Sequence, residues 1–164
     1  MRARVPDIWV SVSATTRPPR PGETEGRDYF FLSPDEFRRR IDEDEFLEWA
    51  EVHGNRYGTM RGPVDRMVAN GRQVILEIDV QGAEQVRRRA LDATTIFIVA
   101  PSPEELLRRI HKRGAETEEQ IATRMKTAEQ EFQLVGKYDY VVINDDVSRA
   151  TNELVCIIDS LSEE

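Results

Sequence analysis

The sequence is poor in lysine and cysteine and contains no long apolar run. Its 164 residues include a single cysteine, Cys156, so no disulfide can form within the chain. Lysine occurs only at positions 112, 126 and 137, and arginine carries the other side-chain positive charges. No apolar stretch approaches the roughly 20 residues of a membrane helix, and the first residues lack the apolar core of a secretory signal. These absences predict a cytoplasmic protein that neither spans a membrane nor depends on disulfides.

The composition that remains is typical of one folded domain. Hydrophobic residues make up 39% and charged residues 33% of the chain, and the net charge is −8. An acidic chain is a poor candidate for general nucleic-acid binding, but it can bind a phosphate where its cations gather. The excess of arginine over lysine suits a planar, two-pronged grip on phosphate. Genome composition is the alternative cause of that excess.

Apolar runs alternate with helical patterns over most of the chain. Buried strands are predicted at 74–78, 94–99 and 138–143, and capped helix starts at Ser33-Pro34, Ser102-Pro103 and Thr117. This alternation predicts an α/β fold in which helices flank a parallel sheet. Residues 16–59 depart from it and predict a small β-rich insert, with strands at 27–32 and 46–52. The arginine runs 38–40 and 87–89 are predicted to lie on solvated helix faces.

A proline-stiffened arginine pair gives the strongest chemical signal. Arg17 and Arg20 stand three residues apart among Pro18, Pro19 and Pro21. Two guanidinium groups directed at one spot repel each other unless an anion lies between them, and a terminal phosphate offers two charges and enough acceptors. The stiff loop would lose little entropy on binding. A proline-rich surface turn is the alternative interpretation.

The segment 15–32 resembles the signature of the guanylate kinase family. Further blocks resemble that family in its order and spacing; they are Glu48–Glu51, Gly54–Thr59, Leu76–Gly82, Arg109–Gly114 and Val142–Asp146. The resemblance covers nearly the whole chain from about residues 2–6, which match the tail of a helix. It implies one P-loop-kinase-like domain, with a core at 1–15, 60–112 and 135–164, a GMP-binding part at about 16–59 and a helical lid at about 113–134.

The resemblance assigns one group of residues to GMP. Those matching the phosphate side are Ser13, Arg17, Arg20, Tyr29 and Tyr57, with Glu23 supporting the arginines. Those matching the guanine side are Glu48, Thr59 and Asp79. The chemistry agrees, because guanine presents N1–H and an amino group side by side and a carboxylate can accept from both. Adenine has no donor at N1 and would leave Glu48 buried and unpaired.

A second group matches the ATP side of the family. Arg109, Arg113 and Arg124 correspond to arginines that neutralise the transferring phosphoryl group, and Asn144 corresponds to a position near adenine. Mg²⁺ is implied as the companion of ATP, with Glu77 and Asp79 able to contact it through water. The expected partners are GMP and ATP, with no nucleic acid and no membrane. The sequence indicates no oligomeric state. Ordinary helix surface is the alternative for the three arginines.

One family element has no counterpart in the printed sequence. The phosphate-binding loop G-x-x-x-x-G-K-[ST] is absent, since the only Gly-Lys pair is Gly136-Lys137, followed by tyrosine. In the family its strand is central and would lie between 74–78 and 94–99. A start codon assigned too late and a diverged protein that lost phosphoryl transfer both explain the absence. The sequence therefore predicts GMP binding by a catalytically incomplete chain; a non-enzymatic binding module and a kinase for another nucleoside monophosphate are the alternatives.

Overall fold

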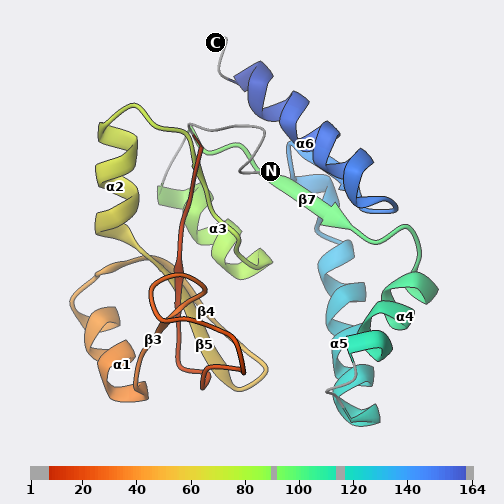
Figure 1. Cartoon of the computed structure of the whole chain (residues 1–164), viewed down its shortest axis with the longest axis horizontal. Helices are drawn as coiled ribbons and strands as arrows, with labels where there is room; N and C mark the ends of the chain where they lie inside the picture. The colour runs from red at the N-terminus through yellow and green to blue at the C-terminus, as the bar shows by residue number, and fades with distance from the viewer. Residues whose placement is uncertain (1–7, 90–91, 114–116, 162–164) are drawn as a thin grey trace. The chain divides into compact units, whose positions relative to one another are not determined.

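The computed structural model describes residues 8–89, 92–113 and 117–161 (Figure 1). The predicted helix tail at residues 2–6 lies outside them. Contacts group the chain into two compact units, Arg4–Ala93 and Thr94–Glu164, and each is described by itself. The predicted α/β class is confirmed, because helices alternate with strands and both two-stranded sheets are parallel. No helix in the described ranges is long and apolar enough to cross a membrane.

The first sheet of the first unit is a short parallel pair. Strand β1 (Trp9–Val10) pairs with β6 (Val74–Ile75), in a register that aligns Trp9 with Val74. The predicted strand 74–78 is therefore wrong beyond Ile75. Its partner β1 ends at Val10, and no other strand in the described part of the chain forms a ladder with the backbone from Leu76 onward. It leads instead into helix α3 (Val80–Arg89).

A four-stranded sheet, in the order β3-β2-β5-β4, forms the β-rich part of this unit. Strand β2 pairs with β3 in parallel and with β5 antiparallel, and β4 and β5 form a hairpin. The hairpin turns at His53 and Gly54, whose φ angles of 51° and 77° suit a type I′ turn. The strand bounds are Ser13–Thr15 (β2), Phe30–Phe31 (β3), Phe46–Val52 (β4) and Asn55–Met60 (β5). Strand β4 was predicted with these bounds, whereas β5 was not predicted.

Helix α1 (Pro34–Asp42) covers one face of this sheet. It begins as predicted, because the Ser33 hydroxyl accepts a hydrogen bond from the Glu36 backbone N–H at 3.1 Å. Its Phe37 packs with Ala14 and Phe46 in the core, and the two phenyl rings stack at 4.4 Å between centroids. Side chains alternate along a strand, so the neighbours of Ala14 in β2 face the opposite side. Helix α2 (Arg61–Ala69) follows β5 and has Asn70 as its C-cap.

The described part of the second unit holds a parallel pair of strands, three α-helices and a short 3₁₀ helix, η1 (Val135–Lys137). Strands β7 (Ile96–Val99) and β8 (Tyr140–Ile143) pair in register, and the helices are α4 (Pro103–Arg113), α5 (Glu118–Phe132) and α6 (Val147–Leu161). The predicted capping box at Thr117 is confirmed. The predicted burial of both strands is wrong in part, since Ile98, Val141 and Ile143 are 41–54% exposed whereas Val142 is fully buried. Side chains project from the two faces of a sheet, and an apolar sequence does not show which of those faces other elements cover.

Candidate functional site

Arg17 is held in place by a carboxylate in the proline-rich loop. Its Nη1 and Nη2 donate to the two oxygens of Glu23 at 3.0 and 2.8 Å. The Arg20 backbone N–H donates to the same carboxylate at 2.6 Å. These bonds, with the Arg17 contact foremost, hold the pKa of Glu23 below its usual value. Glu23 therefore orients Arg17 and shapes the loop, while the Arg20 side chain remains exposed.

Two tyrosines flank the Arg17 side chain. The guanidinium carbon lies 5.4 Å from the centre of the Tyr29 ring, a cation–π distance. The Tyr29 and Tyr57 rings meet edge to face, 6.1 Å between centroids. Contact with Glu23 raises the pKa of Arg17, and Tyr57 contributes to that rise despite partial burial. Arginine and two phenol rings thus form one cluster, which combines a fixed positive charge with hydroxyl donors.

A row of polar side chains crosses the same sheet face. Ser13, Thr59 and Glu48 are register partners on β2, β5 and β4. Paired residues project to the same side of a sheet, as do residues two apart in a strand. Tyr57 therefore shares the face of Thr59, about 7 Å along β5. The face opposite α1 carries the arginine–tyrosine cluster at one end and the Glu48 row at the other.

Glu48 is a carboxylate buried inside this row. Only 4% of the residue is exposed. Burial raises the pKa of Glu48, the negative charge of Asp79 raises it further, and the polar groups of Thr59 oppose part of the rise. The Thr59 hydroxyl is also buried and has no partner of hydrogen-bond geometry among the described residues. A buried acceptor and a buried hydroxyl therefore stand side by side, ready for a ligand that offers both donors and an acceptor.

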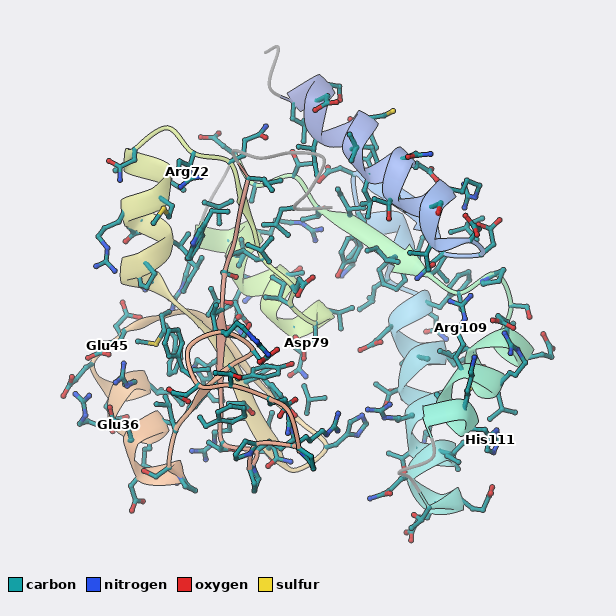
Figure 2. All side chains as sticks on the ribbon, viewed as in Figure 1. Glu36, Glu45, Arg72, Asp79, Arg109 and His111 are labelled. Carbon is teal, nitrogen blue, oxygen red and sulfur yellow. The ribbon has the colours of Figure 1, made fainter. Side chains whose placement is uncertain are left out.

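Asp79 lies at the start of α3 (Figure 2). One of its oxygens, Oδ1, accepts a hydrogen bond from the Gly82 backbone N–H at 2.8 Å. Glu77, two residues earlier, is exposed. Across the described ranges, no three His, Cys, Asp or Glu side chains gather as a metal site.

The predicted ATP-side residues belong to the second unit. Arg109 projects from α4 (Figure 2) and donates to Glu105 at 2.7 Å. Arg108 and Arg109 hold the pKa of Glu105 at about 2. Arg124 is half-buried on α5, and the Asn144 Oδ1 after β8 is buried without a partner in the described part of the chain. The side chain of Arg113 lies outside the described residues.

Sequence reasoning missed the contacts that α3 makes with β4. The Gln85 side chain bonds to both backbone groups of Trp49, and Arg89 donates to the carbonyls of Phe46 and Leu47. The predicted solvated face fits Arg88 and Arg89, which are both exposed, although Arg89 also contacts the β4 backbone. An arginine run gives no sign of which member lies beside an uncovered strand edge, so only the tertiary fold reveals this.

Known proteins resemble this chain over most of its length. A sequence model described as guanylate kinase matches residues 4–161. A guanylate kinase of Clostridium perfringens is 53% identical over 152 residues, which cover 93% of this chain and 70% of that protein. One of Caldanaerobacter subterraneus is 51% identical and is covered to 74%. The crystal structure of guanylate kinase from Anaplasma phagocytophilum superposes with a TM-score of 0.84 at 36% identity, covering 97% of this chain and 78% of that one. The match of the family model to nearly the whole chain, together with these relatives, shows that this chain belongs to the guanylate kinase family.

Proposed function

We propose that residues Ser13–Asp79 form a GMP site in which Glu48 reads guanine and Arg17 binds phosphate. The observation that carries the proposal is the buried Glu48 carboxylate beside an unpartnered Thr59 hydroxyl. Guanine N1–H and the 2-amino group would donate to Glu48, and O6 would accept from Thr59. A second carboxylate, Asp79, lies near enough to Glu48 to raise its pKa, and the 2-amino group has a further hydrogen to donate to it.

The other end of the same face would hold the phosphate. Arg17, fixed by Glu23, and exposed Arg20 supply charge, and Tyr29, Tyr57 and Ser13 supply hydroxyl groups. About 7 Å of β5 between Tyr57 and Thr59 leaves room for a ribose. Charged hydrogen bonds contribute about 1.5–3 kcal/mol each, so two of them at each end give micromolar affinity a physical basis.

The family activity we infer is transfer of the ATP γ-phosphoryl group to GMP, which gives GDP and ADP. The nucleophile is a phosphate oxygen of GMP, so no side-chain nucleophile is needed. Arg109, Arg113 and Arg124 would neutralise charge on the transferring group, and the unpartnered Asn144 Oδ1 would accept from adenine. Mg²⁺ would accompany ATP, with Glu77 and Asp79 contacting it through water. The printed sequence has no G-x-x-x-x-G-K-[ST], so GMP binding by this chain is to be measured separately from turnover.

Calorimetry with GMP, AMP and UMP tests the proposal. We expect GMP to bind and AMP to bind about 10²- to 10⁴-fold more weakly, since two contacts to buried groups are lost. Arg17→Ala should weaken GMP by about 10- to 100-fold, whereas Arg38→Ala, an exposed arginine on α1, should have no effect. Equal affinity for all three nucleotides would contradict guanine reading, and peptide binding without GMP binding would favour a non-enzymatic module. GMP-dependent ADP release by this chain at a normal rate would refute its catalytic incompleteness.

A further inference from the structure

Helix α3 completes the outer edge of the four-stranded sheet. Strand β4 is the last strand in that sheet, so one side of its backbone has no neighbouring strand. The Trp49 N–H donates to Gln85 Oε1 at 3.2 Å, and Gln85 Nε2 donates to the Trp49 carbonyl at 2.6 Å. The side-chain amide therefore pairs with Trp49 as the backbone of another strand would.

Arg89 continues this attachment one turn further along α3. Its Nη1 donates to the carbonyls of Phe46 and Leu47 at 2.9 and 3.2 Å. Gln85 and Arg89 are four residues apart and lie on one helix face, which Gly82 shares three residues before Gln85. Two side chains thus fix α3 against the backbone on either side of Glu48.

Gly82 is the point at which this helix meets the Glu48 carboxylate. A Cβ added to Gly82 would lie 2.2 Å from Glu48 Oε2 and 3.0 Å from its carboxyl carbon. Ordinary contacts of that kind begin near 3.4 Å. The Gly82 N–H also bonds to Asp79. One buried glycine therefore touches both carboxylates of the proposed guanine reader.

We propose that Gly82 is a positioning residue for guanine recognition, whose missing side chain sets the place of the Glu48 carboxylate and whose N–H orients Asp79. The inference rests on the proposed GMP site and adds a specificity determinant to it. Gln85 and Arg89 fix α3 against β4, so the helix cannot retreat from a larger residue at position 82 without breaking these bonds. The Glu48 carboxylate is the group that must move instead.

A comparison with Gly58 separates positioning from simple close packing. A Cβ at Gly58 would meet the Glu48 carbonyl oxygen and the Phe46 ring at 2.9 Å, so substitution there disturbs the hairpin itself. At Gly82 the two nearest atoms belong to the end of the Glu48 side chain, which can rotate, and the third, Ile78 Cβ at 3.3 Å, has to shift by only a few tenths of an ångström. Gly82→Ala should therefore still fold, but it should bind guanine weakly.

The binding test compares Gly82→Ala with Gly62→Ala. Gly62 is also helical, and its nearest neighbour beyond the helix backbone is Arg66 Nη1 at 3.9 Å, so alanine fits there. Calorimetry is done with GMP and with IMP, which has the same phosphate and ribose but no 2-amino group. We expect Gly82→Ala to weaken GMP by about 10- to 100-fold and to reduce the preference of GMP over IMP towards unity. Gly62→Ala should retain both values.

A general loss of structure would weaken GMP and IMP by the same factor and leave their ratio unchanged, which would overturn the proposal. Wild-type GMP affinity in Gly82→Ala would also overturn it. Failure of the unaltered chain to bind GMP would refute the proposed function, and the contact itself would then be tested by thermal denaturation. Gly82→Ala should lower Tm in the unaltered chain but not in the Glu48→Ala background, where the obstructed carboxylate is gone. An equal loss of Tm in both backgrounds would show that the glycine serves helix packing alone.

Discussion

Replacing Glu48 by glutamine should change stability and binding in opposite directions. The carboxylate is 4% exposed, and burial together with Asp79 raises its pKa. An acid whose pKa is raised on folding is favoured in its neutral form, so its ionisation costs stability as pH rises through the folded pKa. At pH 7 that cost is present in the unaltered chain and absent in Glu48→Gln. The variant should therefore have the higher Tm at pH 7, and the difference should shrink as the pH falls below about 4, where Glu48 becomes neutral in the unfolded as well as the folded chain.

Glu48→Gln should also strongly weaken the binding of GMP. Glutamine can accept from one guanine donor through its oxygen, but its NH₂ group then faces the other donor. One charged hydrogen bond, of about 1.5–3 kcal/mol, becomes an unsatisfied buried pair that costs about 1–3 kcal/mol more. The sum corresponds to roughly 10²- to 10⁴-fold in Kd. The GMP phosphate also titrates near pH 6, but this affects both proteins equally. The Kd of Glu48→Gln divided by the Kd of the unaltered chain therefore reports on Glu48 alone. This ratio should fall as the pH is lowered through the Glu48 pKa.

Thermal denaturation and calorimetry on the same two samples provide the test. A purely structural Glu48 predicts that Tm and GMP affinity fall together. A lower Tm for Glu48→Gln at pH 7, or an affinity within about threefold of the unaltered chain, would refute the reasoning. Glu51, an exposed residue on the same strand, supplies the control: Glu51→Gln should change neither quantity measurably.

Two further outcomes follow from the cluster and the core. Glu23→Gln should weaken GMP by about 3- to 10-fold, less than Arg17→Ala, because an amide keeps one of the two bonds that orient Arg17; calorimetry on both variants checks the order, and equal losses would contradict it. Phe37→Ala should lower the free energy of unfolding by about 3–5 kcal/mol, because its fully buried ring stacks on Phe46. Urea titration measures this against Phe132→Ala, which removes a ring that is 57% exposed and should change it by no more than about 0.5 kcal/mol.

Local signals predicted the helices better than the strands. Ser33 and Thr117 cap α1 and α5 as predicted, since a cap depends on residues within one helical turn. Strand β5 was missed because Asn55–Met60 is largely polar and is a strand only by virtue of its partners on both sides. The strand predicted at 74–78 failed for the converse reason: its apolar residues extend beyond the two-residue partner β1.

In the candidate site too, contacts between residues close in sequence could be predicted and contacts between distant residues could not. Arg17 and Glu23 lie six residues apart in one stiff loop, and their ion pair agrees with the supporting role predicted for Glu23. The contacts of Gly82, Gln85 and Arg89 join positions more than 30 residues apart. Neither a glutamine nor a glycine in a helix indicates a distant strand edge, so no sequence pattern could have identified them. The resemblance to a family predicted residues for ligand contact and one supporting carboxylate, Glu23, but not the helix residues that contact β4 and Glu48.

The two faces of the four-stranded sheet separate stability from binding. Ala14 and Phe46 face α1 in an apolar core, whereas Ser13, Glu48 and Thr59 face the other way with a buried charge and an unpartnered hydroxyl. Burial of unsatisfied polar groups costs stability, so the second face lowers the stability of the free protein. A ligand that donates hydrogen bonds to Glu48 and accepts one from Thr59 would recover that cost on binding. GMP should therefore raise Tm well beyond the effect of inorganic phosphate at the same concentration, because phosphate contacts only the Arg17 end. Equal increases in Tm from both ligands would show that the arginine cluster alone accounts for GMP binding.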